Sequence, residues 1–158
     1  MKFKDEIIDL TVIDAKEGKE IGVVVDILFK RGIQETAGLI LKRDNQKYLA
    51  PPEQIYSLGR DYVVIKEKEN LLEVNTEELL TAQDLFGIAV VTIEGTNLGI
   101  VKDVVLTEEG GISSYELSDG LVQDILTGRD LLAADQNISY SDQKMIVEES
   151  MTVVEESD

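Results

Sequence analysis

The 158-residue chain contains no cysteine and no histidine. Without cysteine it forms no disulfide and offers no thiolate as a nucleophile or metal ligand. Without histidine it lacks the side chain most often used as a general base, a transition-metal ligand or a switch near neutral pH. Because these absences remove the commonest catalytic groups, we predict that the chain is not an enzyme.

Long apolar runs are also missing. Residues 1–6 lack the apolar run of a secretion signal, and no stretch approaches the ~20 apolar residues of a membrane span. The sequence therefore predicts a cytoplasmic protein that has no membrane span. Attachment to a membrane through a partner protein stays open.

The chain does contain a second, altered copy of much of itself, because residues 8–72 return as residues 85–154. In the clearest fragment, Gly-x-x-x-Gly is followed by an apolar stretch and an aspartate. It recurs at a spacing of 77 residues, as Gly18, Gly22 and Asp26 and then as Gly95, Gly99 and Asp103. Two copies argue against an open solenoid, which needs about three or more units to cover its core.

The repeat predicts two small domains, at residues 1–75 (the first half) and 76–158 (the second half). Domains of roughly 70–80 residues are only marginally stable by themselves. We therefore expect contact between the halves, or dimerisation, to contribute to stability.

The net charge of −17 is distributed unequally, at −2 in the first half and −15 in the second. Phosphate would be repelled by the second half, which argues against direct contact with nucleic acid. A basic protein is the better candidate partner, because opposite charges speed encounter and select partners. The alternative is that the acidity serves only solubility.

Apolar, β-branched segments separated by polar or glycine-containing turns predict an all-β fold. In the first half we predict strands at 10–13, 21–29, 37–41, 47–50 and 62–65, and a helical turn at 52–55 after two prolines. In the second half we predict strands at 88–93, 98–106, 112–117, 144–147 and 151–154. Short strands in this number suggest a small barrel or half-barrel in each half.

Three further segments stand out. Residues 75–84 look like a short linking helix capped by Asn75 or Thr76. The second copy has gained six residues around 119–128, where the apolar spacing predicts a short helix near 120–127. An acidic tail follows at residues 155–158.

The order of these motifs resembles the PRC-barrel family. The resemblance rests on Gly18, Gly22, Val24 and Asp26, then Pro51 or Pro52, Ile55, Leu58 and Gly59, with Gly95, Gly99, Val101, Asp103 and Ile138 in the second copy. It implies two small, strongly bent β-barrels in tandem, each of about five to six short strands with short helical turns. It also implies a protein-binding module without an active site, as in the photosynthetic reaction-centre H subunit and the ribosome maturation factor.

The candidate partner-binding residues are carboxylates of the second half, in or beside its predicted loops and insertion: Glu108, Glu109, Glu116, Asp119 and Asp124. They lack the alternating ligand order of a twelve-residue calcium loop, and we predict no metal or cofactor site. The near-neutral first half is expected to contact a second copy in a homodimer, or another protein. Two rival interpretations are a structural or membrane-peripheral accessory factor and a small-ligand or calcium sensor.

The repeated glycines and aspartates are interpreted as structural. Strands are predicted on both sides of each Gly-x-x-x-Gly, whereas a phosphate loop runs from a strand into a helix, so the glycines serve turns and bulges. Asp26 and Asp103 interrupt apolar strands, where a carboxylate is costly unless it is hydrogen-bonded. We expect each to accept backbone N–H groups from an adjacent turn.

Overall fold

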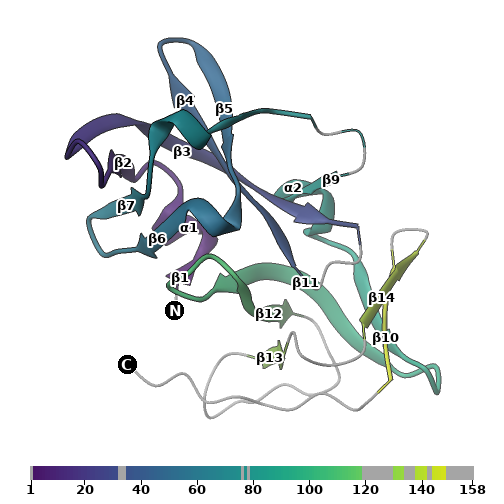
Figure 1. Ribbon diagram of the computed structural model, residues 1–158. Helices are drawn as coiled ribbons and strands as arrows, with labels where there is room; N and C mark the ends of the chain where they lie inside the picture. Colours follow the sequence, from purple (N-terminus) through teal and green to yellow (C-terminus); the bar gives the residue numbers. More distant parts are fainter. Residues whose placement is uncertain are drawn as a thin grey trace.

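The computed structural model describes residues 2–31, 35–75, 77, 79–118, 130–133, 138–141 and 144–148. Most of these residues lie in β-strands, which form two sheets accompanied by short helices (Figure 1). The predicted all-β class is therefore confirmed. The predicted helix near 120–127, the strand at 151–154 and the acidic tail at 155–158 lie outside the described residues.

The first sheet is built mainly from the first half of the chain. Its path runs in the order β6-β7-β2-β3-β4-β5-β8. These strands span Thr11–Asp14 (β2), Lys19–Lys30 (β3), Thr36–Arg43 (β4), Gln46–Ala50 (β5), Ile55–Leu58 (β6), Tyr62–Ile65 (β7) and Leu72–Glu73 (β8). Residues 52–54 form the predicted helical turn (η1, Pro52–Gln54), and a second one follows β7 (η2, Lys68–Asn70).

The second sheet has a corresponding arrangement, with the path β13-β12-β11-β10-β15-β14. Its strands span Ala89–Thr92 (β10), Asn97–Leu106 (β11), Ile112–Ser118 (β12), Asp130–Ala133 (β13), Ile138–Ser141 (β14) and Lys144–Val147 (β15). Each sheet contains one parallel pair, β2 with β7 and β10 with β15. Bulges bend the long strands, but within the described residues neither sheet closes into a complete barrel.

Each half contributes a short strand and a helix of one turn to the sheet of the other half. The first half begins with β1 (Lys2–Phe3) and α1 (Lys4–Ile7), and β1 pairs with β11 of the second sheet. The second half begins with β9 (Leu79–Thr81) and α2 (Ala82–Leu85), and β9 pairs with β3 of the first sheet. The sheets therefore cross the boundary at residue 75.

One hydrophobic core runs through both halves. It joins first-half side chains such as Val24 and Leu41 to second-half side chains such as Val101 and Met145. Ile7 of α1 and Leu85 of α2 lie fully buried within it. The predicted contact between the halves is thus present, because burying this shared apolar surface stabilises both at once.

The segment before the second repeat differs from its prediction as a single helix over 75–84. Residues 79–81 form strand β9, because they find a partner on β3, and the helix begins only at Ala82. Its cap is Thr81: the Thr81 Oγ1 accepts the Asp84 N–H at 3.3 Å, and the Asp84 Oδ2 accepts the Thr81 N–H at 2.8 Å. This reciprocal capping box places the helix cap six residues beyond Asn75 and five beyond Thr76, the two expected caps.

Candidate functional site

Two of the predicted partner-binding residues lie together on one turn. The connection from β11 to β12, residues 107–111, carries Glu108 and Glu109, and we call it the acidic turn. Both side chains are exposed. Within the described part of the chain, neither carboxylate has a cationic partner at ion-pair distance. The turn therefore presents two negative charges to solvent.

Internal hydrogen bonds hold the acidic turn in one shape. The Thr107 N–H donates to the Gly111 carbonyl at 2.8 Å, and the Gly110 N–H donates to the Thr107 carbonyl at 3.0 Å. The Thr107 Oγ1 accepts the Gly111 N–H at 3.0 Å. These bonds satisfy the backbone groups of the turn, so its two carboxylates project from a fixed base.

The acidic turn is also bonded to the first half of the chain, beside β6 in Figure 1. The Leu58 N–H donates to the Glu108 carbonyl at 2.7 Å, and the buried Thr36 hydroxyl donates to the Gly110 carbonyl at 2.6 Å. Gly110 has φ +88°, and a Cβ there would lie 2.8 Å from Cδ1 of Ile55. The positive φ favours glycine at this position, and the absence of a side chain leaves room for Ile55 of the first half.

A cleft of about 620 Å³ adjoins the acidic turn where the two halves meet. Gly111 and Ile112 line it from the second half, and Thr36, Pro52 and Leu72 line it from the first. Leu72 is 50% exposed, so the cleft offers apolar surface next to the two carboxylates. A site that combines charge with apolar surface suits a protein segment better than a lone ion.

Of the other predicted partner-binding residues, Glu116 alone lies in the described part of the chain. Glu116 lies in β12 with only 5% of the residue exposed, and its Oε1 is 3.5 Å from Nζ of Lys102. Glu116 is thus buried in the middle strand between β11 and β13, and the expectation that it contributes to an exposed acidic surface is wrong. Asp119 and Asp124 lie outside the described residues.

Asp26 and Asp103 occupy equivalent bulges in the long strands β3 and β11. The Asp26 Oδ1 accepts the Ile27 N–H at 2.8 Å, and the Asp103 Oδ1 accepts the Val104 N–H at 2.7 Å. Each carboxylate thus caps the next amide of its own strand, whereas the sequence suggested an adjacent turn. In both strands the residue left out of the pairing at the bulge stands immediately before the aspartate.

Burial raises the pKa of Asp103, and the nearby Asp5 and Glu116 add to this effect. The Val104 and Lys4 amides oppose the shift but do not cancel it. A raised pKa means that the folded state favours the neutral acid, so ionising Asp103 costs stability as the pH rises above 3.8.

We therefore expect Asp103→Asn to raise the melting temperature at pH 7, because the amide oxygen still accepts the Val104 N–H without carrying a charge. The gain should shrink as the pH falls toward the ordinary value of 3.8 and vanish below it. Thermal denaturation from pH 2.5 to 7 measures this difference. A variant less stable than the wild type at pH 7 would contradict the expectation.

The glycines of the repeat divide into two kinds of position. Gly18 and Gly95 lie in the turns that join the hairpin strands, and both have positive φ. Gly22 and Gly99 lie within β3 and β11. A Cβ on Gly22 would stand 2.5 Å from the Lys42 carbonyl oxygen, so close contact between β3 and β4 requires glycine there.

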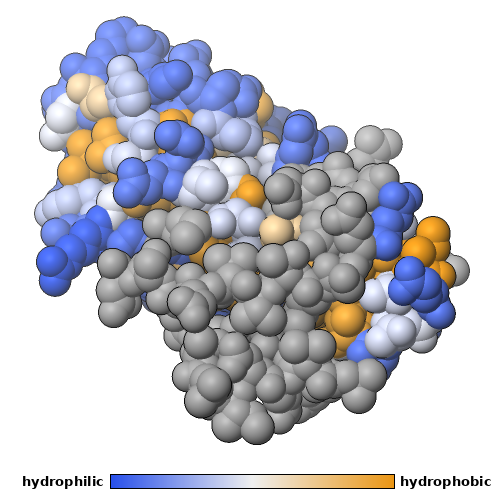
Figure 2. Space-filling model, turned by 90° about the horizontal axis from the view of Figure 1, so that it is seen from below, coloured by the Kyte–Doolittle hydropathy of each residue, from blue (hydrophilic) through white to orange (hydrophobic). Residues whose placement is uncertain are grey.

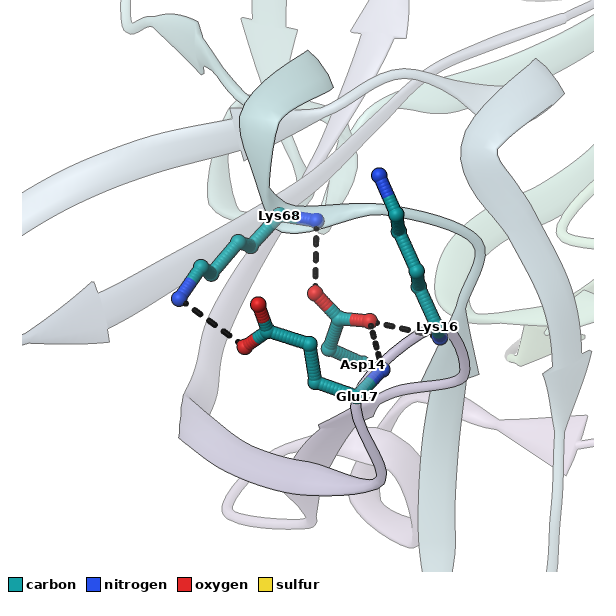
Figure 3. A network of polar contacts seen from close by, with 4 residues as sticks. All are labelled: Asp14, Lys16, Glu17 and Lys68. Carbon is teal, nitrogen blue, oxygen red and sulfur yellow. Dashed lines mark hydrogen bonds and ion pairs between the residues drawn. The ribbon is translucent and has the colours of Figure 1, made fainter.

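A second polar network, at Asp14, was not identified from the sequence (Figure 3). The Asp14 Oδ1 accepts the N–H groups of Lys16 at 2.7 Å and Glu17 at 3.1 Å, and Oδ2 accepts the Lys68 N–H at 2.9 Å. The Lys68 ammonium reaches Glu17 at 3.1 Å. An aspartate opening a polar turn is a known signal for such bonds, but only the fold brings Lys68 to it.

The Asp14 network is structural. Burial by itself would raise the pKa of Asp14, but the three amides and the Lys68 charge outweigh it, and the pKa is lowered below 3.8. The ionised carboxylate is thus favoured by the folded state, and its contribution is lost as the pH falls through that lowered pKa. In the second half Thr92 takes the equivalent place, where its Oγ1 accepts the Thr96 N–H at 3.0 Å.

We expect Asp14→Asn to lower the free energy of unfolding at pH 7 by about 1–3 kcal/mol, because an amide cannot accept all three N–H groups. The loss should diminish as the pH falls from 3.8 through the lowered pKa of the folded protein, because the wild-type carboxyl then also becomes protonated. Urea denaturation at pH 7 and pH 2.5 checks this. An unchanged free energy at pH 7 would contradict the role given to the network.

Some features are not found in the described part of the chain. There, no three acidic side chains converge as a metal site would require. No helix in the same residues is long and apolar enough to cross a membrane.

The described surface differs in hydropathy between its two sides when the molecule is seen from below (Figure 2). The surface at the left belongs to the first half and is mostly hydrophilic. Hydrophobic side chains gather at the right, where β10 and β14 lie.

Taken together, the two matching sheets and the repeated bulges define an all-β protein made of two related repeats. The family model of the PRC-barrel domain matches this sequence twice, over residues 1–72 and 77–152. The chain therefore belongs to the PRC-barrel family, as a tandem member. No curated protein is significantly similar to it.

Proposed function

We propose that this protein is a non-catalytic interaction module whose second half binds a basic protein. The observation that carries the proposal is the acidic turn, with two exposed carboxylates on a base hydrogen-bonded to both halves. Binding residues are commonly presented in this way, on a loop that a rigid scaffold positions.

The charge of the second half supports the proposal that the partner is basic. Its net charge of −15 creates a negative potential that attracts a basic surface over several ångströms and repels an acidic one. Such complementarity raises the association rate and selects the partner more than it raises the affinity. The two glutamates would then fix the orientation of a partner that the overall charge has already attracted.

The cleft beside the acidic turn supplies the apolar part of the proposed interface. Leu72 and Ile112 present apolar surface there, within the same region as the two carboxylates. Buried apolar contacts surrounded by polar groups carry most of the energy of protein interfaces. The proposed partner segment therefore combines lysine or arginine with an apolar side chain that enters the cleft.

The test is affinity capture from native lysate at low salt, followed by titration of the recovered basic protein. Reversing both charges, with Glu108→Lys and Glu109→Lys, should weaken binding by about tenfold or more and flatten its salt dependence. Glu94→Lys is the matched control, because Glu94 is also exposed but lies in the turn at the opposite end of β11. If all variants bind equally, or no basic protein is recovered, the proposal fails.

A further inference from the structure

The two halves meet through an exchange of equivalent elements. We call the contacts of β1 and α1 with β11, and of β9 and α2 with β3, the seam. We propose that the seam is a binding surface for a second copy of this chain, in which each half accepts the complementary half of another molecule. The partner is thus another copy of the same protein.

Equivalent residues are paired on the two sides of the seam. Phe3 stands opposite Val105, and Thr81 stands opposite Leu28. Thr81 follows Phe3 by 78 positions, as α2 follows α1, and Val105 follows Leu28 by 77, as in the glycine motif of the repeat. The exchange is therefore reciprocal, like the contact between two subunits related by a twofold axis.

The side chains at the seam lie inside the core. Ile7 and Leu85 occupy corresponding positions on α1 and α2, and each is fully buried. The two segments also meet each other, because the Lys4 ammonium lies 5.0 Å from the centre of the Phe86 ring. Without the other half, each sheet would expose the apolar surface that these side chains cover.

Every contact across the seam joins one first half to one second half. An identical set of contacts forms when the two halves belong to different molecules, so the contact energy does not favour one arrangement. Only five residues, 74–78, connect β8 to β9, and this covalent link raises the effective concentration of the partner half. Once the link is cut, exchange between copies depends on concentration alone.

The experiment uses the full chain with a protease site inserted after Asn75, which is exposed. After cleavage we expect both fragments to elute together at the volume of the intact protein. Cleaved protein with and without ¹⁵N label, once mixed, should give mixed pairs in native mass spectrometry. Separation of the fragments at micromolar concentration, folded or unfolded, overturns the proposal, and so does a complex that never exchanges halves.

A seam variant and its control sharpen the result. Ile7→Ala in the cleaved protein should raise the concentration at which the halves separate by about tenfold or more, since it truncates a side chain buried across the seam. Ile93→Ala should leave it unchanged, because Ile93 is 65% exposed and follows β10, away from the seam. Equal effects of the two substitutions would contradict the assignment of the seam.

Discussion

Replacing Ile7 by alanine in the intact chain is expected to lower the free energy of unfolding by about 2–5 kcal/mol. Ile7 is fully buried in the core that both halves share, although it lies near the N-terminus on a helix of one turn. The substitution leaves a cavity that the surrounding strands can fill only in part. Because that core is common to both sheets, the variant should unfold in one transition that still includes both halves.

Urea denaturation, monitored through tyrosine signals from each half, measures the effect of the Ile7→Ala substitution. Tyr62 reports on the first sheet and Tyr115 on the second. The control Ile93→Ala should change the free energy of unfolding by less than about 0.5 kcal/mol, as expected for an exposed site. Two separate transitions, with only the second half affected, would show that the halves unfold independently.

The second large effect is expected at Gly22. An alanine Cβ there would stand 2.5 Å from the Lys42 carbonyl oxygen, a backbone atom held by the pairing of β3 with β4. The strands must move apart to accept it, and this disrupts the Val23–Lys42 pairing beside the bulge. We expect Gly22→Ala to lower the free energy of unfolding by about 3 kcal/mol.

Gly18→Ala is the matched comparison within the same hairpin. Gly18 has φ +69°, but no atom lies within 4 Å of the position that a Cβ would take. Its substitution should lower the free energy of unfolding by about 1 kcal/mol, because a residue with a side chain disfavours the left-handed conformation. Thermal and urea denaturation of the two variants distinguishes the cost of close contact at Gly22 from the cost of backbone conformation at Gly18. Equal losses in the free energy of unfolding would contradict this distinction.

The sequence predicted the hairpins and the all-β class because those features are local. The glycine turns and β-branched runs around Gly18 and Gly95 specify two long hairpins with few alternatives. The acidic turn was also recognisable, since Glu108, Glu109 and two glycines interrupt two apolar segments. Its hydrogen bonds to Leu58 and Thr36 were not, because they join residues far apart in the chain.

The exchange of elements was not predictable for a related reason. Lys2-Phe3 and Leu80-Thr81 have no residue type in common, and these strands are too short to carry a periodic signal. Their conformation comes from the edges of β11 and β3 on which they lie. Glu116 escaped prediction similarly: Ser114, Tyr115, Glu116 and Leu117 are all buried, so alternation along β12 does not separate an inner face from an outer one.

The reciprocal exchange has a consequence for how the two repeats diverge. In a dimer of identical subunits, any change to one turn appears in both copies at once. Joining two such units in one chain removes this constraint, so that corresponding positions can acquire opposite charges. Glu108 of the acidic turn lies 77 positions after Arg31, a positively charged residue that directly follows the equivalent long strand of the first repeat, β3. Covalent fusion thus lets a nearly symmetric scaffold carry different charges on its two equivalent turns, which no symmetric dimer can have.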